Sequence, residues 1–182
     1  NAMVPAILIL TFAVSLKNMT GLLGAATYVE GVMKAASAGL FSMLPAIIFI
    51  VACLLAFATG TSWGTFGILI PIVLPIFKVG DPLLMIGISA CLAGAVCGDH
   101  CSPISDTTIM ASAGANCNHI EHVQTQLPYA VTVALISFVN FIIAGFVKNA
   151  WICLPIGIVM TIVVLFILRA TVGKRTSVAA EK

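Results

Sequence analysis

Charged side chains are scarce in this sequence. Its 182 residues include 8 lysines and arginines and 6 aspartates and glutamates, so 8% of the chain is charged. Soluble domains carry about 25% charged residues, and a soluble globule could not cover its surface with so few. The net charge is only +2, and no basic cluster with interleaved aromatic residues is present. Both features exclude a nucleic-acid-binding protein.

Hydrophobic residues take the place of charge and make up 61% of the chain. This composition predicts an all-α integral membrane protein, in which each crossing helix needs about 20 apolar residues. Two ordinary spans are predicted at residues 129–147 and 151–168, with Tyr129 and Trp151 at the membrane interface. Most of the six cysteines lie in apolar runs. They are interpreted as packing residues and not as a disulfide framework.

A first break interrupts the long apolar stretch at residues 44–77. Glycine and hydroxyl residues fill positions 59–65, and the arms on either side, 45–58 and 66–77, are shorter than a membrane crossing. This pattern predicts a re-entrant helical hairpin, in which Gly60 takes a left-handed conformation and Ser62 caps the second arm. The alternative is one long span, kinked by prolines in its second half.

A second break follows the apolar stretch at residues 83–96. Pro103 disfavours helix at Ser102, so the preceding helix should end near Cys101. Ser102 is then expected to cap a second half-helix with Pro103 at its first position, which makes a discontinuous transmembrane helix. A loop is predicted at residues 114–127.

Two aspartates flank the second break. Asp99 lies at the C-terminal end of the preceding helix, where the helix dipole opposes its charge. An ionised side chain inside the membrane is costly, so Asp99 is expected to hold a cation or a proton, unless it pairs with His100 or a lysine. Asp106 falls in the first turn of the next helix and could simply satisfy that helix terminus. His100 could be a proton relay, a partner of Asp99 or a capped polar residue.

A metal centre is the competing interpretation of the second break. Cys97, Asp99, His100 and Cys101 offer zinc ligands, but their spacing matches no common zinc pattern. The surrounding hydroxyl groups favour a hard cation such as Na⁺. His119 and His122, three residues apart, are interpreted as a solvated face of the 114–127 loop.

Three segments resemble the NhaC-type sodium/proton antiporters. They are FATGTSWGTFG at residues 57–67, GDHCSPISDTT at 98–108 and TQLPY at 125–129. The resemblance covers about residues 40–150 and implies membership of the wider ion-transporter superfamily. Proteins of that superfamily contain two inverted repeats, each with a hairpin and a broken helix. Family chains are more than twice as long as this one, which implies that the chain is the C-terminal repeat.

The resemblance implies a secondary antiporter that exchanges Na⁺ for H⁺ and uses no cofactor beyond the transported ions. Asp99 and Asp106 would alternate between Na⁺ and protons. Hydroxyl groups would complete the oxygen shell of the ion, from Ser102, Ser105, Thr107, Thr108, Thr61, Ser62 and Thr65. The family also includes Na⁺- and H⁺-coupled exchangers of organic acids such as malate and lactate, which remain an alternative. An intramembrane metalloenzyme and a passive channel are alternatives of other classes.

The expected setting is the inner membrane of a bacterium. Asn1 and Ala2 precede Met3 and are interpreted as a cloning remnant, and residues 3–168 are taken as one transmembrane domain. Basic residues in the tail, 169–182, place it in the cytoplasm, with the 114–127 loop on the same side and the 78–82 turn outside. The expected partners are the lipid bilayer and the N-terminal half of the transporter, and a homo-oligomer is left open.

Overall fold

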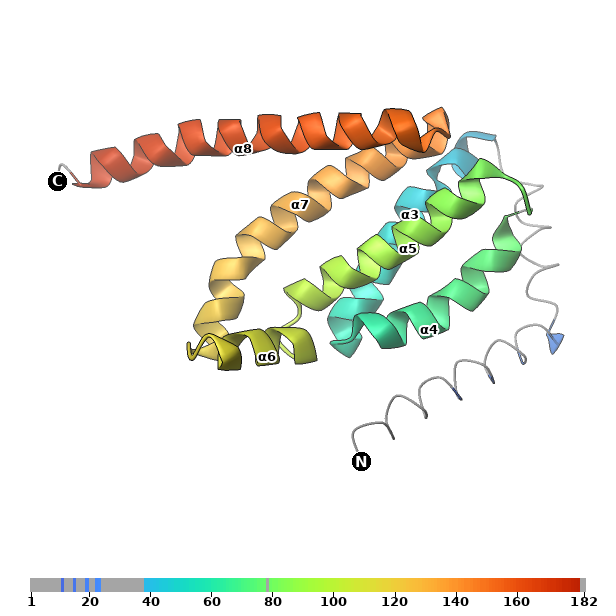
Figure 1. The fold of residues 1–182 in the computed structure, drawn as a ribbon, viewed down its shortest axis with the longest axis horizontal. Helices are drawn as coiled ribbons and strands as arrows, with labels where there is room; N and C mark the ends of the chain where they lie inside the picture. The colour runs from blue at the N-terminus through green and yellow to red at the C-terminus, as the bar shows by residue number, and fades with distance from the viewer. Residues whose placement is uncertain are drawn as a thin grey trace.

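The computed structural model describes residues 38–77 and 79–180, together with residues 11, 15, 19, 22 and 23. For residues 38 and 171–180 it describes the backbone alone. The supposed cloning remnant, Lys78 and the last two residues therefore lie outside the described part. The described chain is helical and contains no strand (Figure 1). Its elements are α3 (Ala38–Thr59), α4 (Ser62–Val73), the short 3-10 helix η1 (Leu74–Ile76), α5 (Pro82–Cys101), α6 (Asp106–Gly114), α7 (His119–Val147) and α8 (Ala150–Ala180).

Four helices are long and apolar enough to cross a membrane. These segments are Gly39–Thr59, Pro82–Cys101, His119–Val147 and Ala150–Ala170, while Ser62–Ile76 is a shorter apolar helix. The predicted all-α membrane fold is therefore confirmed, and the two ordinary spans lie within α7 and α8.

The chain reverses direction between α3 and α4, so that α4 runs back beside α5 (Figure 1). Gly60 has φ of 68°, which is the predicted left-handed conformation. Because the chain turns back between the two helices (Figure 1), the alternative prediction of one long kinked span is wrong. The first arm of the hairpin is longer than predicted, a helix of 22 residues that begins at Ala38. Helix α5 has 20 residues and runs from Pro82 to Cys101, where the sequence predicts its end. Asp81 caps α5 by accepting a hydrogen bond from the Leu83 amide at 2.9 Å, which fixes the start of this helix.

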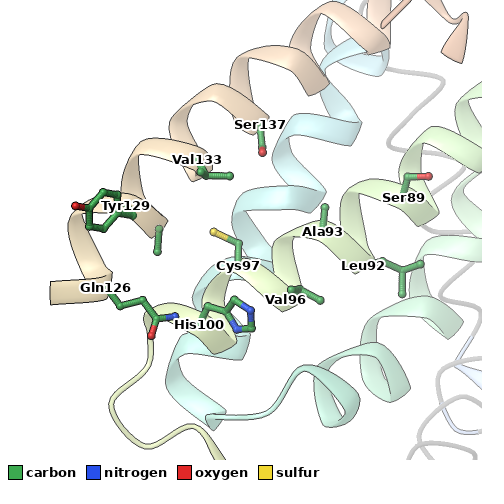
Figure 2. Close-up of a pocket in the computed structure, with 11 residues that line it drawn as sticks. Ser89, Leu92, Ala93, Val96, Cys97, His100, Gln126, Tyr129, Val133 and Ser137 are labelled. Atoms are coloured by element: carbon green, nitrogen blue, oxygen red, sulfur yellow. The ribbon is translucent and has the colours of Figure 1, made fainter. Parts of the chain in front are cut away.

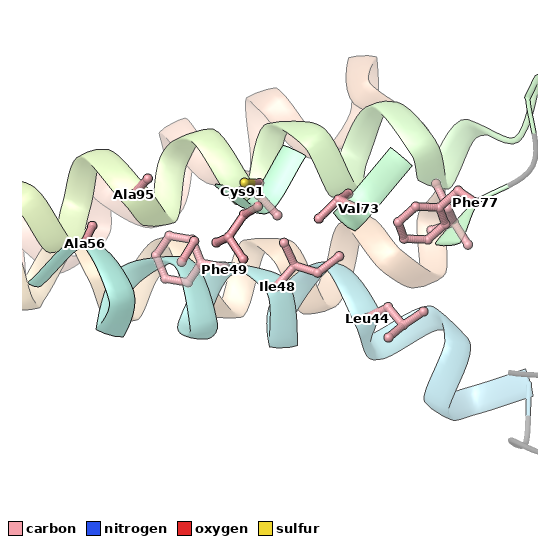
Figure 3. Packing of buried hydrophobic residues seen from close by; sticks show 12 residues of the cluster. Leu44, Ile48, Phe49, Ala56, Val73, Phe77, Cys91 and Ala95 are labelled. Atoms are coloured by element: carbon pink, nitrogen blue, oxygen red, sulfur yellow. The ribbon is translucent and has the colours of Figure 1, made fainter. Parts of the chain in front are cut away.

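Small residues bring α3 and α5 into close contact, and the two helices form the centre of the core (Figure 3). A Cβ atom at Gly98 would collide with the backbone carbonyl of Cys53, and one at Gly94 with that of Phe49. Ala52 and Ala56 on the facing helix are fully buried. In a membrane, where lipid is as apolar as the helices, such close approach supplies the packing contacts that hold helices together.

The caps at both breaks lie elsewhere than predicted. Thr61, and not Ser62, is the N-cap of α4, and its hydroxyl oxygen accepts from the Gly64 amide at 3.5 Å. Ser102 ends α5 as its C-cap, because its amide donates to the Asp99 carbonyl at 3.0 Å. Ser105 caps α6 instead, and the break therefore spans four residues.

The predicted 114–127 loop is largely helix. Asn118 caps α7 by accepting hydrogen bonds from the Ile120 and Glu121 amides at 2.9 and 3.4 Å, so the helix begins at His119. The connection between α6 and α7 is only four residues long, 115–118, and Asn116 within it has φ of 51°. The backbone of α8 likewise continues as helix through most of the predicted tail, to Ala180.

Candidate ion-binding site

The two breaks in the helices meet in space. The Ser102 hydroxyl donates to the carbonyl of Phe57, near the end of α3, at 2.8 Å. A Cβ atom at Gly60 would lie 2.7 Å from the carbonyl oxygen of Ile104. The turn of the hairpin therefore rests directly against residues 102–105, hereafter the connector, which joins α5 to α6.

Asp99 lies at the centre of this region and is 1% exposed. The Ser105 hydroxyl donates to its Oδ1 at 2.7 Å, and the Thr107 hydroxyl donates to its Oδ2 at 3.1 Å. The hydroxyl oxygens of Ser105 and Thr107 are themselves 2.7 Å apart. These are the hydrogen-bond partners of the carboxylate among the described residues, so the expected alternative of pairing with His100 or a lysine is not seen there.

Thr108 adds an oxygen without a partner. Its amide donates to the Ser105 hydroxyl oxygen at 3.3 Å, which fixes the first turn of α6. Its own Oγ1 is buried and, within the described residues, makes no hydrogen bond. Buried polar atoms nearly always have a partner, so this hydroxyl is suited to a ligand.

Asp106 is placed differently from Asp99. It is the first residue of α6, as predicted, and its side chain is exposed. Its Oδ1 accepts from the Thr107 amide at 2.8 Å. Among the described residues, the Asp106 carboxylate makes no hydrogen bond to the side chains of Asp99, Ser105 or Thr107.

The hydroxyls of the first break form a second group. Thr65 is fully buried, and its hydroxyl donates to the Thr61 carbonyl at 2.9 Å. Ser62 is also buried. In the described structure the hydroxyls of Thr61, Ser62 and Thr65 make no hydrogen bond to Asp99. The two groups are joined by the close approach of Gly60 to Ile104 and by the Ser102 hydroxyl, which donates to the Phe57 carbonyl.

The cysteines near Asp99 do not build a metal centre with it. Cys53, Cys97 and Cys101 are free, partly buried thiols. Across the described residues, no three His, Cys, Asp or Glu side chains are placed to hold a metal ion. The zinc set suggested by the sequence is therefore not gathered in space.

A pocket of about 740 Å³ lies between α5 and α7 (Figure 2). Its wall is mainly apolar, and His100, Gln126 and Tyr129 lie together at one end, away from Ser89 and Ser137. Gln126 and Tyr129 were not predicted as site residues. The TQLPY segment gave a resemblance but no role in a site, and Tyr129 was predicted only to lie at the membrane interface.

His119 also lies elsewhere than the sequence analysis predicts. It does not lie on a solvated loop face. Its Nε2 is 2.7 Å from the Pro103 carbonyl oxygen, and its Nδ1 is 3.0 Å from the Ser112 hydroxyl oxygen. The first residue of α7 therefore contacts both the connector and α6.

The profile of the Na⁺/H⁺ antiporter family matches residues 1–146. The chain belongs to this family. It is 44% identical over 167 residues to an uncharacterized protein of Haemophilus influenzae, an alignment covering 91% of the chain and 32% of the relative. A malate-2H⁺/Na⁺-lactate antiporter of Bacillus subtilis is 35% identical over 98 residues, covering 53% of the chain and 21% of the relative.

A further relative is an uncharacterized Na⁺/H⁺ antiporter of Haemophilus influenzae, 32% identical over 111 residues, or 59% of the chain and 24% of the relative. The chain thus spans a third or less of the length of these curated relatives. No solved structure shows significant similarity to it. Family membership and the four apolar helices identify a multi-pass membrane protein of the Na⁺/H⁺ antiporter family.

Proposed function

We propose that the protein exchanges Na⁺ for H⁺ and that Asp99 binds the two ions alternately. The observation that carries the proposal is the group formed by Asp99, Ser105 and Thr107. Three short oxygen–oxygen contacts join these side chains, at 2.7, 2.7 and 3.1 Å. A hydroxyl group has one proton, so the two hydroxyls can fill only two of the three contacts when the carboxylate is ionised.

The unfilled contact has two chemical solutions. A proton on Asp99 supplies the third hydrogen bond and removes the buried charge. A sodium ion instead neutralises the carboxylate and takes the oxygens as ligands, since hard cations prefer oxygen. Na⁺ binding then requires the proton to leave the same carboxylate, and competition of this kind is the basis of antiport.

Hydroxyl oxygens of neighbouring residues could complete the coordination shell of the bound Na⁺. Thr108 supports the proposal most directly, because its buried hydroxyl has no partner in the described residues. We include the remaining hydroxyls of the two breaks as further ligands or supports, namely Ser102, Thr61, Ser62 and Thr65. Asp106 would act as a second carboxylate, reached by the ion on its way to or from Asp99.

The experiment is pH recording in vesicles that contain the full-length protein. An imposed Na⁺ gradient should move protons in the opposite direction, and Li⁺, K⁺ and malate should be compared with Na⁺. A proton flux that follows voltage alone would indicate a channel. No Na⁺-driven proton movement under any condition would contradict the proposal.

A second candidate, Na⁺- or H⁺-coupled exchange of an organic acid, is supported by the pocket between α5 and α7. Its apolar wall and its polar end at His100, Gln126 and Tyr129 suit a small organic solute. A relative of this chain bears the name of a malate/lactate antiporter. Proton movement that requires malate or lactate would favour this candidate over simple Na⁺/H⁺ exchange.

A further inference from the structure

We propose that His119 is a positioning residue, which fixes the connector and α6 so that Ser105 and Thr107 stay on the Asp99 carboxylate. The inference rests on the proposed function of the Asp99 site. His119 touches neither Asp99 nor its two partners in the described hydrogen bonds. It acts through the backbone and side chain of the segments that carry them.

The imidazole ring joins two separate segments. A carbonyl oxygen only accepts hydrogen bonds, so Nε2 must carry a proton and donate to Pro103, at 2.7 Å. Pro103 lies two residues before Ser105. On the other side of the ring, Nδ1 is 3.0 Å from the hydroxyl of Ser112, which lies four residues after Thr108 on α6. His119 thus holds the chain on both sides of Ser105 and Thr108.

Helix α6 depends on such contacts because it is short. It has nine residues, and helices of fewer than about 12 residues are marginal alone. Thr108 and Ser112 are its only buried residues. Thr108 belongs to the end at Asp99 and Ser112 to the end at His119, so the histidine holds the far end of the helix.

The bond to Pro103 is compatible with both protonation states of the ring. The neutral Nε2–H tautomer donates to Pro103 and can accept at Nδ1 from Ser112. The imidazolium also donates to Pro103 and gives its Nδ1 proton to Ser112, whose hydroxyl then donates to the Ile109 carbonyl at 2.9 Å. His119 can therefore hold Pro103 and Ser112 together in either protonation state.

His122 provides a matched control. It lies one turn further along α7, and its side chain makes no hydrogen bond to the described residues. His122→Ala removes an imidazole from the same helix without touching the connector.

The first measurement is the kinetics of Na⁺-driven proton exchange by the full-length protein in vesicles. His119→Ala should raise KM for Na⁺ by about 2- to 12-fold, the range implied by one net hydrogen bond, with a smaller change in kcat. His119→Gln should restore KM, because its amide nitrogen takes the position of Nε2, whereas His119→Asn, which reaches only the position of Nδ1, should not. A His119→Ala protein with wild-type KM, or a His119→Gln protein as impaired as His119→Ala, would overturn the proposal.

The second measurement does not depend on transport. Hydrogen exchange of the full-length protein in detergent should be faster over residues 102–108 in His119→Ala than in wild type, and unchanged in His122→Ala. Equal rates of hydrogen exchange over residues 102–108 in all three proteins would overturn the proposal that His119 holds the connector. If the wild-type protein shows no Na⁺-driven proton movement, the proposed function fails, and hydrogen exchange alone decides whether His119 holds the connector.

Discussion

Asp99 is a buried acid whose described partners are two neutral hydroxyls. The carboxylate also lies at the C-terminal end of α5, where the helix dipole disfavours negative charge. A buried carboxylate that has lost its water is costly to keep ionised unless it is paired or neutralised. Two neutral hydroxyls offset only part of such a cost, and a proton or a cation would supply the rest.

Replacing Asp99 should therefore remove coupling. We expect Asp99→Asn in the full-length protein to abolish Na⁺-dependent proton movement in vesicles, since the amide keeps the shape but can neither release a proton nor neutralise Na⁺. Asp106→Asn is the comparison variant, and it should retain partial activity because its exposed side chain makes a hydrogen bond that an amide oxygen can replace. Wild-type exchange by a well-expressed Asp99→Asn protein would remove Asp99 from the mechanism. A strong loss of Na⁺-dependent proton movement in Asp106→Asn, with little loss in Asp99→Asn, would show that the two aspartates have the reverse roles.

The hydroxyl of Thr108 offers a separate test. An unsatisfied buried polar group costs about 1–3 kcal/mol, so Thr108→Val should leave the Tm unchanged or raise it. If the hydroxyl binds the ion, the same variant should raise KM for Na⁺ several-fold. Thr132→Val, on an exposed face of α7, is the matched control. An unchanged KM in Thr108→Val would show that the hydroxyl is not a ligand.

At the scale of elements, the contact between α3 and α5 should tolerate little substitution. Gly98→Val should lower the stability of the full-length protein by about 1–3 kcal/mol, because the side chain would collide with the Cys53 carbonyl. The measurement is the Tm of the purified protein. Gly114→Ala is the control, since a Cβ atom there meets nothing within 4 Å. Equal Tm values for Gly98→Val and wild type would contradict the observed packing.

The breaks were predictable from local chemistry, and the caps were not. Proline at 103 correctly indicated the end of α5 near Cys101, and glycine at 60 correctly indicated the left-handed turn. Both residues act on the adjacent backbone and need no other part of the fold. Ser102, however, uses its hydroxyl to contact Phe57, 45 residues away in the chain. A contact of that kind is set by tertiary packing, and Ser105 is then left to cap α6.

The start of α7 had a local signal in the sequence, the capping residue Asn118, but the polar composition around it concealed that signal. The polar stretch after residue 118 reads as a loop by composition, yet Asn118 is an effective cap and the following residues continue as helix. His119 was misplaced for the same reason. Once the helix begins there, the ring is directed at the connector, and no spacing in the sequence indicates that contact.

At the scale of the whole molecule, the helices fix which turns share a side of the membrane. Helix α5 separates residues 79–81 from the connector, and α6 and α7 keep residues 115–118 at the connector end (Figure 1). We expect a cysteine at position 79 to be labelled from outside intact cells, and Cys117, kept as the single cysteine, to be protected. Both positions are exposed in the described structure. Labelling of both from the same side would contradict this arrangement.

The chain by itself should not transport. In inverted-repeat transporters the ion site lies between the repeats, and one repeat moves against the other. The described residues contain one hairpin and one broken helix. Residues 3–182, purified and reconstituted, are therefore expected to show no Na⁺-driven proton exchange, with the full-length protein as the positive control. Coupled exchange by residues 3–182 alone would show that one such unit is sufficient.

The glycine contacts between α3 and α5 also restrict which motion could accompany the proposed exchange. A slide of α5 along α3 by about 1.5 Å, the rise of one residue, would move Gly94 and Gly98 off the two carbonyls of α3 that only a glycine can approach this closely. The two helices should therefore move together as one rigid body. Phe57 and Asp99 would keep a constant separation in the inward- and outward-facing states. The alternation of access would then arise where α6, α7 or the remainder of the transporter moves past this pair.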